Sequence, residues 1–248
     1  MPDEKTLAQM YGPQYEESFA ADPADDGSSK EPLRVVGWLS KVKPGTFIDY
    51  GCGAGWLLPE AAKLNWQPVG IEFDEEVARA VGNRTGVKVV SRALELEALP
   101  RADILHLGDV LEHLTEMNRQ VPEILMLIKP GGLLIAQGPL ENNTSLFIVV
   151  LRLMRSRWRS RRTEMAPYHV MLATAKGQEM LFRRFGLEEV EFSISEVPWP
   201  APARLTASAM RQPRAVGLFA LRRLSRAVSA LRRGRWGNRY FYVGRWNG

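Results

Sequence analysis

The chain lacks most of the features that mark secreted and membrane-spanning proteins. It contains one cysteine, Cys52, so no disulfide can form within the chain and a reducing compartment is expected. Its first residues, MPDEKTLAQM, are polar and contain no apolar segment of the kind that a signal peptide needs. The most apolar run, Leu146–Met154, is about half of the roughly 18 residues that span a bilayer. These absences predict a cytoplasmic protein without a membrane span.

Acidic residues are absent from one end of the chain. The segment from Val197 to Gly248 contains eleven arginines, no lysine and no Asp or Glu, and therefore carries a charge of +11. Since the whole chain carries +5, residues 1–196 together carry −6. Six further arginines lie between Arg152 and Arg162. Positive charge this localised predicts an anionic partner at one region of the molecule.

The middle of the chain alternates short apolar segments with helical patterns. Strands are expected at 46–50, 68–73, 87–91, 102–108, 133–138 and 187–195, with a turn at 129–132. Helices are expected at 33–42, 54–64, 75–81, 117–128 and 174–186. Strands separated by helices of this length predict an α/β fold, in which right-handed crossovers wind a parallel sheet.

Two arginine-rich helices are expected outside this alternation, at Asn142–Arg162 and Val216–Arg233. In the second, the pattern predicts an apolar side and an arginine side. The apolar side would hold Leu221, Leu224, Val228 and Leu231, and the other side Arg222, Arg223, Arg226 and Arg233. Leu146–Arg162 and Val216–Arg233 could therefore lie on an anionic membrane surface, or bind a lipid diphosphate, or only cover an active site. Nucleic acid is a weaker hypothesis, because few exposed aromatic residues accompany the arginines.

The segment TFIDYGCGAGWLLPEAA, residues 46–62, predicts a buried strand, a glycine turn and a helix. Gly51, Gly53 and Gly55 follow Asp49 at the end of the strand. Glycine tolerates positive φ and lets a ligand approach the backbone closely. In a parallel sheet this turn lies at the carboxyl edge, where ligands bind. A nucleotide-like ligand is therefore expected at Gly51–Gly55.

A second acid and a tryptophan narrow the choice of ligand. Glu72 ends the second strand about twenty residues after the turn. At this position a carboxylate can accept hydrogen bonds from the two hydroxyls of a ribose. A dinucleotide-binding turn requires a glycine at position 56, and this chain has Trp56 there. The pattern therefore favours S-adenosylmethionine over a nicotinamide dinucleotide. Trp56 and Trp66 are expected to pack between helix and sheet.

Four segments occur in the order and spacing of a known family: FIDYGCGAG (47–55), VGIEFD (69–74), GDVLEHL (108–114) and LIKPGGLLIAQGP (127–139). Over residues 11–195 the chain resembles the class I S-adenosylmethionine-dependent methyltransferases, and most closely their ubiquinone-biosynthesis-like branch (methyltransferase types 11–23). The resemblance implies a Rossmann-like, doubly wound seven-stranded sheet, mostly parallel with residues 238–246 as one antiparallel strand, plus helical lid insertions. It divides the chain into a lid segment (1–45), a cofactor-binding core (46–196, with an inserted helix at 142–162), and an arginine-rich insertion with the last strand (197–248).

The same resemblance implies which residues bind the cofactor, S-adenosylmethionine. Asp49 would orient the methionine amine, Glu72 would bind the ribose, and Phe73 would pack on the adenine. Asp109 would lie beside the transferred methyl group, and Tyr15, with Tyr11, would cover the site. The full implied set is Asp49, Gly51, Cys52, Gly53, Gly55, Glu72, Phe73, Asp109 and Tyr15. The chain lacks the family's acid after the third strand, so Ala93 and Leu94 could supply a backbone contact to the adenine instead.

The histidines are the candidates for acid–base chemistry. An alcohol acceptor must lose its proton as it attacks the methyl group. His113 and His169 are predicted to act as base or acceptor ligand, although a helix start and a loop anchor are the structural alternatives. His106, inside the fourth strand, is expected to be structural, and Cys52 to be a small filler between glycines. No metal site is predicted, because the spacing of Asp109, Glu112, His113 and His169 is not diagnostic.

The predicted function is O-methylation of a small-molecule, sugar or lipid-linked glycan acceptor, in the cytoplasm or peripherally at the inner face of the membrane. Alternatives are an N- or C-methyltransferase of a secondary metabolite, a nicotinamide oxidoreductase, and a non-catalytic, membrane-docked scaffold that retains the nucleotide fold.

Overall fold

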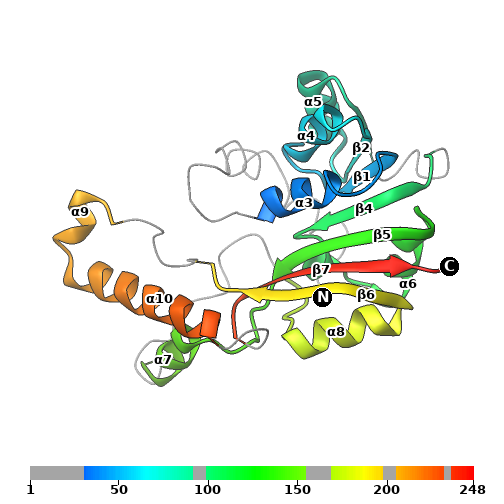
Figure 1. The fold of residues 1–248 in the computed structure, drawn as a ribbon. Helices are drawn as coiled ribbons and strands as arrows, with labels where there is room; N and C mark the ends of the chain where they lie inside the picture. Colours follow the sequence, from blue (N-terminus) through cyan, green and yellow to red (C-terminus); the bar gives the residue numbers. More distant parts are fainter. Residues whose placement is uncertain (1–30, 92–98, 155–168, 198–204, 232–235) are drawn as a thin grey trace.

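The computed structural model describes residues 31–91, 99–154, 169–197, 205–231 and 236–248. A seven-stranded sheet with the order β3-β2-β1-β4-β5-β7-β6 forms its centre (Figure 1). The strands are β1 (Thr46–Tyr50), β2 (Gln67–Glu72), β3 (Lys88–Ser91), β4 (Ala102–Gly108), β5 (Ile128–Pro139), β6 (Leu187–Ser195) and β7 (Arg239–Trp246). β7 runs antiparallel to both β5 and β6, and the other pairs are parallel. The predicted seven-stranded sheet with one antiparallel strand is confirmed.

Helices cover both faces of this sheet. They are α3 (Glu31–Leu39), α4 (Leu57–Lys63), α5 (Glu75–Thr85), η2 (Leu111–His113), α6 (Met117–Leu125), α7 (Leu146–Met154), α8 (Ala175–Arg184), α9 (Ala207–Met210) and α10 (Pro213–Leu231). Phe47 of β1 packs with α3 and α4, whereas its neighbour Ile48 packs with α6 and α8. Because successive residues of a strand point to opposite faces, the interior strand β1 is buried along its whole length.

Three predicted strands, at 46–50, 102–108 and 187–195, have the observed bounds. The turn predicted at 129–132 is wrong, because β5 already begins at Ile128. Ile128 pairs with Ala102, and the register then shifts before Ile104 pairs with Leu133. Gly131, with φ +82°, lies in this irregularity. The segment is thus a bulged start of β5.

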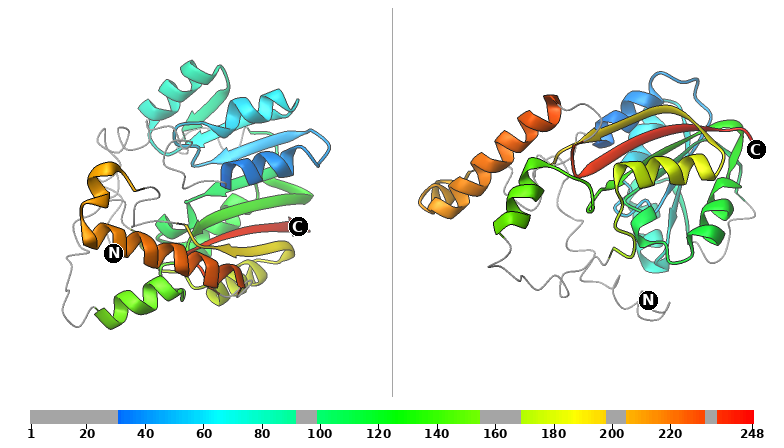
Figure 2. Two further views of the ribbon diagram at one scale, coloured as in Figure 1. Left: turned by 60° about the vertical axis from the view of Figure 1, so that its left-hand side comes forward. Right: turned by 90° about the horizontal axis from the view of Figure 1, so that it is seen from below.

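α7 and α10, which lie in the two segments predicted as arginine-rich helices, contact one another beyond the carboxyl edge of the sheet (Figure 2). The inserted helix predicted at Asn142–Arg162 is observed over Leu146–Met154, and residues 155–168 lie outside the described ranges. Within those ranges, none of the helices combines the length and the apolar character that crossing a bilayer requires.

The sides predicted for α10 are wrong. Leu224 and Leu231 are 56% and 85% exposed, whereas Arg222 is 2% exposed. Arg233 lies outside the described residues. The reason is a buried carboxylate, Glu196, which follows β6 and requires hydrogen-bond donors. A buried charge is costly unless it is paired, so α10 turns its polar side inward.

The Glu196 carboxylate receives hydrogen bonds of 2.7 Å from the Arg222 guanidinium and from the hydroxyls of Ser225 and Ser229. The Ser225 hydroxyl in turn accepts from the Phe147 N–H at 2.9 Å. The Arg222 guanidinium also lies 3.5 Å above the centre of the Phe147 ring. One buried polar cluster thus joins α10, α7 and the end of β6.

Candidate active site

The carboxyl edge of the sheet gathers residues from distant parts of the chain. β1, β2 and β4 end here, followed by Gly51, Phe73 and Asp109. β5 also ends here, and because β7 is antiparallel, its first residue Arg239 pairs with Pro139 at this same edge. The topology therefore concentrates the predicted site residues at one end of the sheet.

The glycine turn is built as the sequence predicted. Gly51, Gly53 and Gly55 have φ values of +72°, +49° and +66°. A Cβ on Gly51 would come within 2.7 Å of the Val110 side chain, so this turn is closely packed on its protein side. At Gly53 a Cβ would meet no atom within 4 Å. The backbone at Gly53 is therefore open to a ligand.

Glu72 lies against this turn. Its carboxylate accepts hydrogen bonds from the Gly53 N–H at 2.8 Å and from the Phe73 N–H at 2.7 Å. Burial raises the pKa of Glu72 above its ordinary value, and these two N–H groups oppose the rise in part. Phe73 is 45% exposed beside it. The structure thus brings an acid and an exposed aromatic ring to the glycine turn.

The side chain of Asp49 pairs with His106, a histidine that the sequence predicts to be structural. Asp49 and His106 are register partners on β1 and β4, and their side chains are buried. Nδ1 of His106 lies 2.7 Å from Oδ1 of Asp49. His106 is buried, as predicted, but its pairing with Asp49 was missed. Asp49 lies one residue before the end of β1 and His106 two residues before the end of β4, so the register that pairs them follows from the sheet and not from the sequence pattern.

Asp109 has a strained backbone. Its φ of +55° lies in the left-handed region, which non-glycine residues seldom adopt and which is frequent at functional sites. Its carboxylate accepts a hydrogen bond from the Arg239 guanidinium at 2.8 Å. Surrounding protein atoms disfavour its charge, but Arg239 outweighs them and holds the pKa of Asp109 below its ordinary value. Arg239, 130 residues away, was not predicted.

Glu112, in η2, is the most deeply buried acid of the site, at 3% exposure. Burial, followed by the neighbouring charge of Asp109, raises the pKa of Glu112 well above its ordinary value, and the two carboxyls share a hydrogen bond. Within the described residues, Oε1 of Glu112 has no hydrogen-bond partner. From the sequence, Glu112 was considered only as a possible metal ligand, in a set of residues whose spacing is not diagnostic.

The two predicted catalytic histidines lie side by side. The rings of His113 and His169 are 5.1 Å apart between centroids, in an edge-to-face arrangement. Nδ1 of His169 lies 2.8 Å from Oε1 of Glu141, which follows β5. The N–H groups of Val170 and Met171 donate to the carbonyl of Glu112, at 2.8 and 3.1 Å, and so fasten the His169 segment to η2. Glu141 was not predicted.

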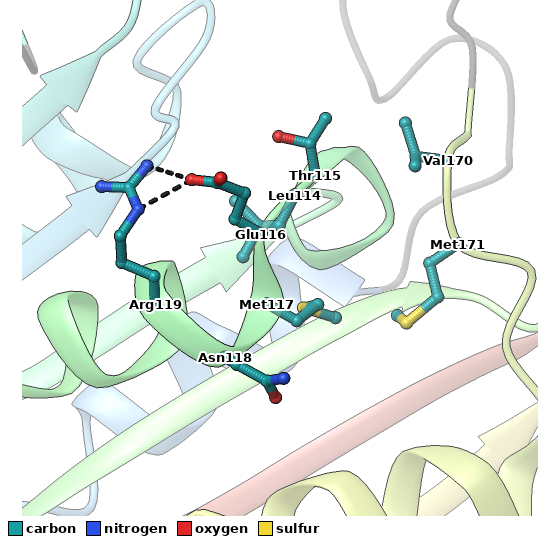
Figure 3. Close-up of a pocket in the computed structure, with 8 residues that line it drawn as sticks. All are labelled: Leu114, Thr115, Glu116, Met117, Asn118, Arg119, Val170 and Met171. Carbon is teal, nitrogen blue, oxygen red and sulfur yellow. Dashed lines mark hydrogen bonds and ion pairs between the residues drawn. The ribbon is translucent and has the colours of Figure 1, made fainter. Parts of the chain in front are cut away.

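A pocket opens directly beyond these two histidines in the chain (Figure 3). The side chains of Met117 and Met171 approach one another in it, and the Glu116–Arg119 ion pair lies at one side. The lining residues are Leu114, Thr115, Glu116, Met117, Asn118, Arg119, Val170 and Met171. The pocket thus combines an apolar wall with a polar rim.

Several sequence predictions have other outcomes. Tyr11, Tyr15, Ala93 and Leu94 lie outside the described residues. The Cys52 thiol is buried in a cluster with Leu58 and Val81, and burial raises its pKa far above the ordinary value, in keeping with a filler. Trp66 is buried as predicted, and its indole N–H donates to the Leu39 carbonyl at 3.0 Å. Trp56 is 37% exposed, so the prediction that it packs between helix and sheet is wrong.

Comparison with known proteins identifies the family of this chain. A methyltransferase-domain model matches residues 29–191. The ubiquinone biosynthesis O-methyltransferase of Bordetella avium is 33% identical over 113 residues, which cover 41% of this chain and 46% of that relative. The chain spans about half the length of the curated relatives it matches.

Solved structures share the fold over nearly the whole chain. The magnesium protoporphyrin IX methyltransferase of Synechocystis PCC 6803, with bound SAH, has a TM-score of 0.63 at 13% identity, covering 98% of this chain and all of that one. The cyclase SpnF has a TM-score of 0.57 at 18% identity, covering 99% of this chain and 96% of that one.

Proposed function

The chain belongs to the S-adenosylmethionine-dependent methyltransferases, and we propose that it methylates a hydroxyl oxygen of a small-molecule, sugar or lipid-linked glycan acceptor. The observation that carries the proposal is the His169–Glu141 pair, which lies at the carboxyl edge beside His113 and the pocket. Transfer to a hydroxyl is the methylation for which a base held in this way is most useful, because an alcohol must lose its proton.

The glycine turn fits S-adenosylmethionine. Space in front of Gly53 would admit the cofactor against the backbone, and the Glu72 carboxylate would accept hydrogen bonds from its ribose hydroxyls. Phe73 would pack on the adenine, and Asp49 and Asp109 would line the methionine end. When bound, the cofactor supplies a methyl group made electrophilic by a positively charged sulfur. No acid of the chain has to activate a leaving group, because a neutral thioether departs.

His169 would remove the acceptor proton. An ionised Glu141 can only accept a hydrogen bond, so Nδ1 of His169 carries the proton between them. Nε2 is then the basic nitrogen and would take the proton from the acceptor hydroxyl, while Glu141 stabilises the resulting cation. His113, next to it, would hold the acceptor oxygen. The apolar wall of Met117 and Met171 offers room for an apolar part of the acceptor.

A panel of hydroxylated acceptors, incubated with methyl-labelled cofactor, tests this proposal. Wild-type protein is expected to give an O-methyl product, identified by NMR. The variant His169→Gln is expected to reduce turnover at least about 100-fold while it still binds S-adenosylhomocysteine (SAH). Methyl groups found on nitrogen or carbon would favour the alternative of an N- or C-methyltransferase. Undiminished turnover by His169→Gln would contradict the role of the base.

A non-catalytic scaffold is the alternative from another class. The cyclase SpnF shares this fold at a TM-score of 0.57, and fold alone does not determine the reaction. The scaffold hypothesis predicts tight SAH binding with no turnover of any acceptor in the panel.

We also propose that α10 and α7 rest on an anionic membrane surface. Val216, Leu224 and Leu231 recur at helical spacing on an exposed side of α10, with Arg223 and Arg226 exposed beside them. Leu153 of α7 is 75% exposed. A surface with apolar residues and arginines, in a region without acids, complements anionic lipid headgroups. Such docking would place the protein at the inner face of the membrane and bring a lipid-linked acceptor near the site.

Vesicle flotation tests this docking. Wild-type protein is expected to float with anionic phosphatidylglycerol vesicles and not with phosphatidylcholine vesicles, and the double variant Leu224→Ser/Leu231→Ser is expected to stay unbound. Met180→Ser, which removes from α8 an apolar side chain about as exposed as Leu224, is the matched control and is expected to float like wild type. Equal flotation of all three proteins would overturn the proposal.

A further inference from the structure

Three side chains that can bind a metal ion lie close together at the carboxyl edge of the sheet, and they come from two segments of the chain. Each of Glu112, His113 and His169 offers one ligand atom, and these atoms all lie within 4.8 Å of one another. η2 supplies the first two residues, and the His169 segment is fastened to η2 by two backbone hydrogen bonds to Glu112. Within the described ranges this is the one group of His, Cys, Asp and Glu side chains gathered so closely.

Glu112 supplies an independent sign of a ligand. Its side chain is 3% exposed, and its Oε1 atom has no hydrogen-bond partner among the described residues. A buried carboxyl oxygen without a partner is expensive, because the hydration that it loses on folding is not replaced. A cation bound by this carboxyl would supply the missing interaction.

The His169–Glu141 hydrogen bond prepares the imidazole for metal binding. With the proton on Nδ1, the Nε2 atom carries the lone pair that can bind a cation. Histidines that bind metals almost always donate their other ring N–H to a carboxylate or a carbonyl, which fixes the ring and makes the ligand nitrogen more basic. Glu141 holds that position here.

We propose that Glu112, His113 and His169 form a binding site for one divalent cation of borderline softness, with Zn²⁺ preferred. Two imidazoles and one carboxylate are a ligand set typical of catalytic zinc, which keeps further positions open. Mg²⁺ and Ca²⁺ are disfavoured because they prefer oxygen ligands. Since zinc–ligand distances are about 2.0–2.2 Å, binding would draw the three side chains closer together than 4.8 Å.

This inference rests on the proposed function and specifies its acceptor. A cation at this site could hold two neighbouring oxygens of the acceptor in its open positions, as in a vicinal diol or a catechol. Coordination lowers the pKa of a bound hydroxyl, whose proton would pass to water. In the loaded site His113 and His169 act as ligands, and the cation takes over the activation that His169 performs as a base in the metal-free site.

Calorimetric titration of chelator-treated, full-length protein with ZnCl₂ tests the site. Wild-type protein is expected to bind one Zn²⁺ per chain, and His113→Gln, His169→Gln and Glu112→Gln are each expected to lower the affinity by at least about tenfold. Glu141→Gln is expected to weaken binding less than these three. Glu123→Gln, an exposed residue of α6, is the matched control and is expected to bind like wild type. The visible absorption of bound Co²⁺ provides an independent reading of the nitrogen ligands.

Substoichiometric Zn²⁺ binding by wild type, or equal binding by wild type and the three ligand variants, would overturn the metal site. Each protein is titrated with SAH in parallel, which confirms that the variants fold. If SAH binds and Zn²⁺ does not, the metal site fails and the proposed function stands. If SAH does not bind to wild type, the proposed function itself fails.

Discussion

Glu72, the last residue of β2, accepts a hydrogen bond from the N–H of Gly53, 19 residues earlier in the chain, at 2.8 Å. The bond fixes a partly buried carboxylate against the one glycine of the turn whose front is open. Binding and stability therefore place opposite demands on this residue, because the charge that serves the ligand is costly to bury.

The substitution Glu72→Gln is expected to change stability and ligand binding in opposite directions. Without ligand, the variant should be slightly more stable than wild type at pH 7, because it does not have to bury a charge. The pKa of Glu72 is raised in the folded state, so the wild type loses stability as the pH rises above the ordinary carboxyl pKa. The difference in melting temperature should therefore grow between about pH 4 and pH 7 and vanish below this range. A difference that shrinks as pH rises would contradict the assignment. SAH affinity should fall about 30-fold or more.

The Asp49–His106 pair is expected to support β1 and β4 from inside the sheet. His106→Leu should lower the free energy of unfolding by about 1–3 kcal/mol, because the buried Asp49 carboxylate loses its hydrogen-bond partner. Urea denaturation measures the change. His106→Asn, which keeps a polar side chain, should cost less than His106→Leu, and the reverse order would show that packing alone matters here.

Glu141 is expected to act through His169 rather than on the acceptor. Glu141→Gln should reduce kcat about 10- to 100-fold and leave KM nearly unchanged, because it weakens the base without removing a contact to the acceptor. In the His169→Gln background the same substitution should have little further effect. Additive losses in the double variant would show that the two side chains act independently.

The Glu196 cluster is expected to hold α10 in place. Arg222→Met should lower the stability of the protein by about 3–5 kcal/mol, because the Glu196 charge stays buried without its cation. The double variant Glu196→Met/Arg222→Met should recover part of that loss, which chemical denaturation would measure. Arg223→Met, at the neighbouring exposed position, should change stability by less than about 0.5 kcal/mol.

The sequence predicts the sheet well wherever the signal is local. β1, β4 and β6 are bounded by turn residues and contain runs of apolar or alternating residues, so their limits could be read directly. The sides of α10 could not, because helical periodicity counts arginine as polar. Arg222 is buried only because Glu196, 26 residues earlier, is folded against it. A buried ion pair of this kind follows from tertiary structure and not from local pattern.

The residues of the site also divide into those that a local motif predicts and those that only the tertiary structure brings together. Gly51, Gly53 and Glu72 belong to short motifs whose spacing is set by one strand–helix–strand unit. Arg239 and Glu141 could not be found in this way, because the antiparallel insertion of β7 beside β5 brings residue 239 to the edge where Asp109 lies. The approach of His169 to His113 depends equally on the backbone bonds that fasten its segment to η2.

Calorimetric titration of wild type and of Glu72→Ala with SAH tests whether the glycine turn and Glu72 bind S-adenosylmethionine. Micromolar binding by the wild type and its loss in the variant are expected, with the fold of the variant verified by circular dichroism. A wild type that does not bind SAH, or a Glu72→Ala variant that binds it with wild-type affinity, would contradict the assignment of the cofactor to the glycine turn and Glu72.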